Sequence, residues 1–183
     1  MMIGRYRFNI YFVLAAAAGL VAGCAAIHKH EEKAGKIGPV STLRLHLEAT
    51  PYFPSDTEEA QIVRDSPVTL TVEKTPFITE ADLDSARLLT VPALGGYDIQ
   101  LKLRQHGTWV LEQITTENVG KHVAILCQFG DKIKEARWLG AIKIPKRISD
   151  GTITFTPDAS KAELDVILAG WTNTIKQVNK ANE

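Results

Sequence analysis

The chain has 183 residues, 45% of them hydrophobic and 23% charged, and its 21 basic and 21 acidic residues cancel. This balance gives no basic footprint of the kind that binds nucleic acid, so the composition excludes that class of partner. A chain of this length can stabilise a domain with its own hydrophobic core, without disulfides.

Residues 1–23 have the pattern of an export signal. Arg5 and Arg7 form a basic start, no acidic residue precedes Cys24, and the apolar run IYFVLAAAAGLVAG leads up to that cysteine. A membrane-spanning helix needs about 20 apolar residues, so this run is short for a span. We expect residues 1–23 to be removed on export. The alternative is an uncleaved signal anchor that ends at a chance cysteine.

The apolar run ends in LVAGC, which resembles the lipobox of bacterial lipoproteins. In that family the cysteine thiol receives a diacylglyceryl group, and cleavage leaves the cysteine as the acylated N-terminus. The small Ala22 and Gly23 fit the processing enzymes. The resemblance implies that Cys24 carries the acyl chains, palmitate among them, that anchor the protein to a membrane. Because Ala25 rather than Asp follows, it implies the outer membrane, with the protein facing the periplasm.

Residues 24–40 predict a flexible tether, because charged residues, Gly and Pro are mixed there without an apolar period. His28 and His30 could bind a metal as an H-x-H pair. Without a rigid frame that adds a carboxylate or a thiolate, we expect a solvated tether and no metal. No second apolar run approaches membrane-spanning length.

Residues 41–175 predict a single domain that begins with strands of alternating polarity. The core-facing residues of three such strands are Leu43, Leu45, Leu47, Val68, Leu70, Val72, Ile99, Leu101 and Leu103. His46 falls on the polar side of the first strand, so we expect it to be exposed. Two prolines predict a loop in PYFPSDTEEA. A T-x-x-D box, Thr79 to Asp82, predicts a short helix in ITEADLDSARLL.

The second half of the domain predicts two helices around a central strand. A helix over residues 107–119 turns its apolar side inward, and HVAILCQF has so little polar alternation that it predicts a strand covered on both faces. A closing helix has Thr156 as N-cap and Pro157 at its first position, and residues 176–183 are a polar tail that frays. The expected core residues are Val110, Leu111, Ile114, Cys127, Trp138, Ile142, Ile144, Ile153, Phe155, Leu164, Ile167, Leu168 and Trp171. These elements predict an α+β fold, a mostly antiparallel sheet with helices packed on one face.

Gly120-Lys121 raises the question of a phosphate site. A Walker loop needs Gly at position 115 and a hydroxyl at position 122, where this chain has Thr115 and His122. Phosphate also binds where a helix begins, whereas the predicted helix ends here. We therefore expect Gly120 to cap the helix C-terminus and Lys121 to complement its negative end, with no bound nucleotide.

The segments ITEADLDSARLL, GTWVLEQITTENVGKHVAIL and ITFTPDASKAELDVILAG resemble the first periplasmic domain of SecD, the P1 head of SecDF. The family motif matches without a gap at Thr115, Glu117, Asn118, Val119, Gly120, Lys121, Ala124 and Ile125. The chain departs from the family at Ala136-Arg137, where Ala-Pro is usual. SecD also works through a multi-span membrane region. The resemblance, over residues 76–171, therefore implies the fold and an affinity for polypeptide segments, without catalytic chemistry or a cofactor.

Two classes of function follow from these residues. The favoured one is a non-catalytic envelope lipoprotein that binds a protein or polypeptide partner, as an accessory to protein export; it predicts an exposed apolar patch or an accessible sheet edge. The alternative is an envelope hydrolase, which predicts a pocket with at least two of five residues: His46, His106, His122, Glu117 and Asp150. Cys127 lies in an apolar strand, where a thiolate is disfavoured. The carboxylate pairs Glu31-Glu32, Glu58-Glu59 and Asp82/Asp84 are expected to be solvated.

Overall fold

The computed structural model describes residues 38–50, 54–63, 67–91, 96–130 and 135–181. The predicted signal, Cys24, the histidines of the tether and the Glu31-Glu32 pair lie outside the described residues. Among the helices that are described, none has the length and apolar character needed to cross a membrane.

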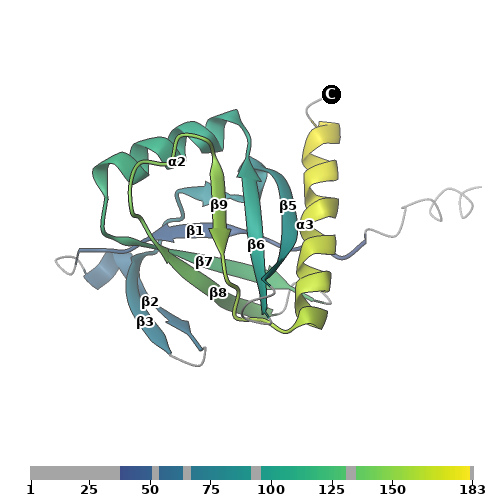
Figure 1. The fold of residues 1–183 in the computed structure, drawn as a ribbon, viewed down its shortest axis with the longest axis horizontal. Coiled ribbons are helices and arrows are strands. Elements are labelled where there is room, and N and C mark those ends of the chain that lie inside the picture. Colours follow the sequence, from purple (N-terminus) through teal and green to yellow (C-terminus); the bar gives the residue numbers. More distant parts are fainter. Residues whose placement is uncertain (1–37, 51–53, 64–66, 92–95, 131–134, 182–183) are drawn as a thin grey trace, which may run out of the picture. The chain divides into compact units, whose positions relative to one another are not determined.

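A four-stranded antiparallel sheet has the order β4-β1-β7-β8 (Figure 1). Its strands are β4 (Ile78–Thr79), β1 (Arg44–Leu47), β7 (His122–Phe129) and β8 (Glu135–Lys143). As predicted, β7 is a central strand, paired with β1 on one side and β8 on the other. The register places His46 of β1 opposite Ala124 of β7, which fixes the sheet face that each side chain occupies.

Two further antiparallel sheets complete the pairing. One has the order β5-β6-β9, formed by β5 (Leu83–Val91), β6 (Gly96–Leu103) and β9 (Thr152–Phe155). The other is a hairpin of β2 (Thr57–Ile62) and β3 (Val68–Glu73), which joins the first sheet through a bridge between Glu48 and Val72. The α+β class and the antiparallel pairing are confirmed, although the strands are divided among three sheets.

The main core lies between the sheets and the two long helices, α2 (Gln105–Glu117) and α3 (Lys161–Ala181). Leu111 of α2 and Trp171 of α3 both belong to it, so both helices serve one core, as predicted. In Figure 1, α2 crosses above the strands and α3 runs beside β5. The opposite face of β1 and β7 is covered by the β2–β3 hairpin, with a second, small cluster of Ala60, Val72 and Ala124.

The prediction of a helix after Thr79 is wrong. The chain forms only one 3-10 turn, η2 (Glu80–Asp82), in which the backbone N–H of Thr79 donates to the Asp82 carboxylate at 3.2 Å. It then becomes strand β5, because Ala86 and Leu88 pair with Leu101 and Ile99 of β6. Pairing with a long neighbouring strand outweighs a local helix signal.

Three other boundaries differ from prediction. The expected loop PYFPSDTEEA contains a short 3-10 turn, η1 (Pro54–Asp56), and most of strand β2. Helix α3 begins after Ser160 rather than Thr156, because Ser160 and Glu163 form a reciprocal cap: each backbone N–H donates to the other side chain, at 3.3 and 2.7 Å. The helix continues to Ala181, so the described part of the predicted fraying tail is helical.

Candidate functional site

His46 is buried, with 2% of its side chain exposed, and not on an exposed polar face as predicted. The β2–β3 hairpin covers it. Nδ1 lies 2.8 Å from the Glu73 carbonyl oxygen, and because a carbonyl only accepts, Nδ1 carries the proton. The Glu58 carboxylate lies 3.7 Å away, and Trp138 packs edge-on against the imidazole. Nε2 has no hydrogen-bond partner among the described residues.

His122 and His106 each hold a different carboxylate. The Nδ1 atom and the backbone N–H of His122 both lie 2.7 Å from Oε2 of Glu48. Burial works to raise the pKa of Glu48, but these hydrogen bonds outweigh it and hold that pKa below its ordinary value. His106 Nδ1 lies 2.7 Å from Asp82, at the other end of α2. Asp82 and Glu58 are therefore half-buried partners of histidines, and not the solvated carboxylates that the sequence predicts.

The remaining candidates of the hydrolase alternative lie apart from these pairs. Glu117 is exposed at the end of α2, and the Asp150 carboxylate accepts the backbone N–H of Thr152 at 3.0 Å. Within the described ranges, no group of three or more His, Cys, Asp or Glu side chains is placed to hold a metal ion. The structure thus keeps these residues apart: His46, His106, His122 and Asp150 make separate local contacts, and Glu117 is exposed.

The C-cap of α2 is Asn118, whose backbone N–H donates to the Ile114 carbonyl, and not Gly120 as predicted. Gly120 lies two residues further on, in the left-handed region with a φ of 94°. Its N–H donates to the Ile144 carbonyl at 2.8 Å, and Ile144 N–H donates to the Lys121 carbonyl, so this turn also joins α2 to the end of β8. Lys121 Nζ lies 3.5 Å from Thr50 Oγ1, turned toward the loop after β1. Cys127 is a core residue, as predicted, and its burial raises the thiol pKa well above the ordinary range.

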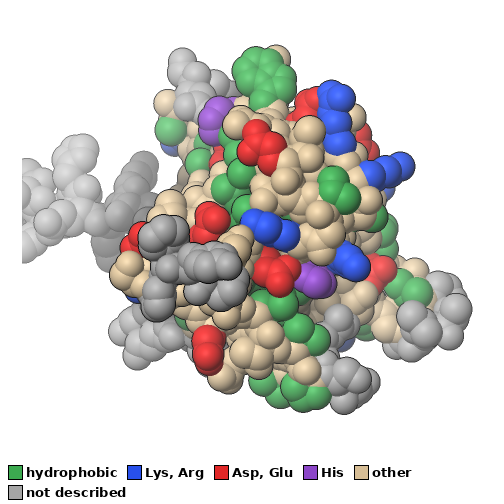
Figure 2. All heavy atoms as spheres, turned by 90° about the vertical axis from the view of Figure 1, so that its left-hand side faces the viewer, with side chains coloured by type: hydrophobic (Ala, Val, Ile, Leu, Met, Phe, Trp, Pro, Cys, Tyr) green, Lys and Arg blue, Asp and Glu red, His purple; other side chains and the backbone are tan. Residues whose placement is uncertain are grey.

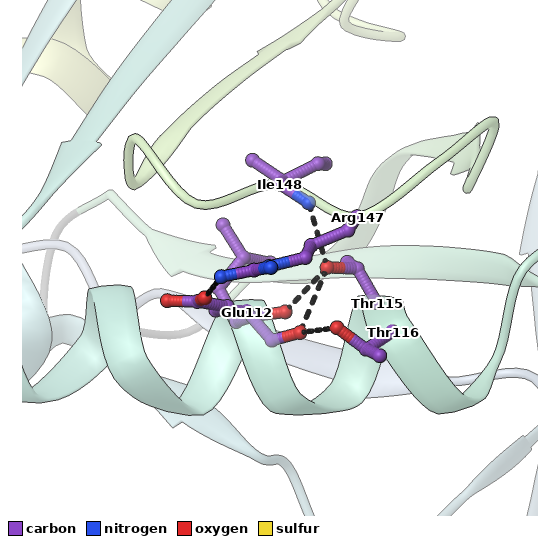
Figure 3. A network of polar contacts seen from close by, with 6 residues as sticks. Glu112, Thr115, Thr116, Arg147 and Ile148 are labelled. Carbon is purple, nitrogen blue, oxygen red and sulfur yellow. Dashed lines mark hydrogen bonds and ion pairs between the residues drawn. The ribbon is translucent and has the colours of Figure 1, made fainter.

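The segment between β8 and β9 fixes one side of α2 (Figure 3). Thr115 is fully buried; its hydroxyl donates to the Leu111 carbonyl at 2.7 Å and accepts the backbone N–H of Ile148 at 2.9 Å. Beside it, Arg147 forms an ion pair with Glu112. These contacts tie α2 to the segment between β8 and β9.

The outer side of α2 carries Trp109, which is 61% exposed. A shallow hollow at the surface is lined by Trp109, Glu112, Gln113, Thr116, Glu117 and Arg147; we call this set the α2 surface. Val119, just past the helix, is 58% exposed. Helical spacing could have identified Trp109, since it lies two residues before the inward Leu111 and so on another side of the helix.

The α2 surface offers contact rather than catalysis. The indole of Trp109 provides a large apolar area, Gln113 and Thr116 provide hydrogen-bonding groups, and the charge of Glu112 is balanced by Arg147. Figure 2 shows the left-hand side of the view in Figure 1, where hydrophobic, basic and acidic side chains are interleaved without a large patch of one sign. An amphipathic aromatic beside adaptable polar groups is typical of protein-binding surfaces.

The family model of the SecDF P1 head subdomain matches residues 56–168, more than half of the chain. The comparison with curated proteins found no similar sequence. Two solved structures share the fold at 18% identity and cover 75% of this chain: one of SecDF as a membrane component that enhances protein export, with a TM-score of 0.50, and one of SecDF in a super-membrane-facing form, with a TM-score of 0.51. The alignments cover 64% and 19% of those chains, less than two thirds of either. The chain therefore belongs to the SecDF P1 head subdomain family.

Proposed function

We propose that this protein is an envelope lipoprotein, anchored by acyl chains on Cys24, whose P1 head domain binds extended polypeptide segments in support of protein export. The binding is non-catalytic. The observation that carries the proposal is the exposed Trp109 on helix α2, in a domain of the P1 head family. The SecDF structure described as enhancing protein export supports the link to export.

The chemistry of the α2 surface suits a polypeptide of varied sequence. Trp109 stacks on apolar or planar groups with little loss of side-chain entropy, because it has only two rotatable bonds. Gln113 and Thr116 can exchange hydrogen bonds with the amide groups of any peptide. Because Arg147 neutralises Glu112, the α2 surface keeps only the single negative charge of the exposed Glu117, so it imposes no strong charge requirement on its partner.

Site-specific cross-linking in intact cells tests the proposed contact. A photoreactive amino acid at Gln113, on the α2 surface, should capture polypeptides, including components of the export channel. The same amino acid at Thr154, exposed on β9, is the control. Trp109→Ala should reduce the Gln113 cross-links by about tenfold, the loss expected for one aromatic anchor. Equal capture from both positions, or consistent absence of export-channel components, would contradict the proposal.

Fractionation tests the anchor separately. Cys24→Ser should release the protein from membranes or leave the unprocessed precursor. Cys127→Ala is the matched control, because it removes the chain's other cysteine, which is buried in the core. Membrane retention of a fully processed Cys24→Ser protein would show that the anchor is not a lipid on this thiol.

A further inference from the structure

Residues 38–42, which we call the strap, lie against the second half of α3 just before strand β1 begins. Two side chains of α3 donate hydrogen bonds to it: Asn173 Nδ2 reaches the Pro39 carbonyl at 2.9 Å, and Trp171 Nε1 reaches the Thr42 carbonyl at 2.9 Å. The Thr174 hydroxyl lies 3.3 Å from the Ser41 carbonyl and shares its single hydrogen between this atom and the Gly170 carbonyl of its own helix, at 3.1 Å.

All three of these contacts end on backbone carbonyls of the strap. On its other side the strap extends the β1–β7 pairing, because Thr42 N–H donates to the Gln128 carbonyl at 2.9 Å. One contact uses a side chain of the strap, because the backbone N–H of Gln128 donates to Thr42 Oγ1 at 3.0 Å. The other contacts recognise an extended main chain. The strap therefore occupies a slot formed by Gly170, Trp171, Asn173 and Thr174 of α3 and Gln128 of β7. This slot would accept different sequences that keep a hydroxyl at the position of Thr42.

Gly170 sets the depth of the slot. A Cβ atom at this position would lie 2.1 Å from Ser41 Oγ and 2.7 Å from Ser41 N, far closer than atoms can approach. Only glycine allows the extended backbone to pass so near the helix. The same approach restricts the residue that sits over Gly170 to a small side chain.

Ser41 occupies that position, but its hydroxyl makes no hydrogen bond to a described residue. Ser41 is 1% exposed. A buried hydroxyl without a partner destabilises the state that buries it. A segment with alanine or glycine in place of Ser41 would make the same main-chain contacts without burying an unpaired hydroxyl. Such a segment would therefore bind the slot more tightly than the chain's own strap does.

We propose that this slot is a second binding site for extended polypeptide, which the strap occupies in cis and which a segment with a small central residue takes when it displaces the strap. The proposal rests on the proposed function only for the class of ligand, and it concerns α3 rather than the α2 surface. Because the strap must leave first, the apparent affinity for the incoming segment is reduced by the fraction of molecules with an empty slot.

Peptide binding to the full chain tests this exchange. The probe is the fluorescently labelled peptide Gly-Pro-Val-Ala-Thr, which copies residues 38–42 with alanine in place of Ser41. Ser41→Leu, too large for the slot, should eject the strap and tighten peptide binding by about tenfold or more relative to the unaltered chain. Ser41→Ala should strengthen the strap and weaken peptide binding by about threefold or more. Fluorescence anisotropy measures both.

Two controls keep the outcome decisive. Adding Gly170→Ala to the Ser41→Leu chain should abolish peptide binding, since the slot itself is then filled. Hydrogen exchange of the amides of residues 40–42 should be slower in Ser41→Ala than in the unaltered chain, a comparison that holds even if Ser41→Leu folds poorly.

Equal peptide affinity in all three chains, or the tightest binding by Ser41→Ala, would overturn the proposal. The assay uses purified protein and a slot on α3, whereas the Gln113 cross-link reports contacts of α2 in cells. If the Gln113 cross-links form but the peptide affinities do not change as expected, the slot proposal fails and the proposed function stands. The reverse pattern means that the proposed function fails and the slot proposal stands.

Discussion

The two faces of the β1–β7 strand pair are both buried, but by different means. One face presents Leu45, Val123 and Ile125 to a core that both long helices and most strands share. The other presents His46 and Ala124 to the β2–β3 hairpin, with Val72 and Ala60 as the apolar contacts. A large core buries a face with bulky apolar side chains. A hairpin can bury the opposite face with small residues and one hydrogen-bonded polar ring.

This difference predicts where the stability lies. Burial of apolar area scales with the size of the side chains that are covered, so the helix-side face contributes most of the hydrophobic free energy. The hairpin face holds few such side chains, and its imidazole is satisfied on one nitrogen only. We expect the hairpin to open locally at a lower free energy than the main core.

Truncation of the largest core side chain should have the largest effect. Trp171→Ala leaves a cavity in the main core and removes the bond to the Thr42 carbonyl, so the free energy of unfolding should fall by about 3–5 kcal/mol. Urea denaturation measures this loss. The exposed Trp109→Ala is the control and should change stability by about 0.5 kcal/mol at most. Similar losses in the two variants would contradict the assignment of the core.

A matched pair of variants compares the two faces directly. Val123→Ala and Val72→Ala remove the same two carbons from fully buried sites, one on each face. Val123→Ala should cost about 2–3 kcal/mol, since a rigid core leaves a cavity. Val72→Ala should cost about 1–2 kcal/mol and speed amide exchange in β2 and β3, because the hairpin can close around the gap. A larger loss at Val72 would reverse the comparison.

The turn that leads from α2 into the central strand can be tested with two glycines. Gly120→Ala forces a side chain into the left-handed region at a φ of 94°, at a cost of about 1–2 kcal/mol. An added Cβ has open space at both Gly120 and Gly96, so Gly96→Ala, at a negative φ, isolates the backbone effect. Thermal unfolding compares them. Equal stability of the two variants would show that the turn does not need glycine.

His46→Leu asks whether the hairpin face requires a polar residue. The change removes the buried Nε2 that lacks a partner and restores apolar contact with Trp138, but it leaves the Glu73 carbonyl without its donor. These effects oppose each other, so stability should change by about 1 kcal/mol or less. A loss several times larger, measured by urea denaturation, would show that the imidazole holds the hairpin in place.

Acid should weaken the fold through two carboxylates, Glu163 and Glu48. The backbone and side-chain hydrogen bonds of Ser160, with the Arg137 ion pair, hold the pKa of Glu163 below its ordinary value of 4.5, as His122 does for Glu48. A lowered pKa stabilises the fold above the unfolded-state pKa, and this stabilisation is lost as the pH falls through the folded-state pKa. Glu163→Gln should therefore cost up to about 1 kcal/mol at pH 7 and progressively less below pH 4.5. A deficit that grows on acidification would contradict this.

The sequence predicts the strands that have one apolar and one polar face, such as β6 and β9, because alternation with period two needs no knowledge of the partner strand. In β3 the prediction holds for Val72, which is buried, but not for Val68, which is 42% exposed. The sequence also predicts α2 and the Gly120 turn, where apolar spacing and a glycine agree. The sequence does not predict the local structure where contacts with a distant element determine it. The hairpin that buries His46 and the strand that recruits residues 83–91 cannot be seen from local pattern.

Two missed features did have signals. The motif SKAE, residues 160–163, is a capping box, and it marks the start of α3 better than the Thr-Pro pair before it. Trp109 lies off the apolar side of α2, which identifies it as an exposed aromatic. By contrast, no local pattern reveals the slot, because it depends on Gly170 meeting Ser41 across 129 positions of the chain.

The strap also determines how the domain would respond to force. If Cys24 is held in a membrane and the domain engages a moving polypeptide, tension enters through Gly38. The bonds to the carbonyls of Pro39, Ser41 and Thr42 follow one another along the chain, so they would break in sequence and not together. Under such tension the strap would detach from α3 before any load reached β1, so the core would stay folded while the strap peels away.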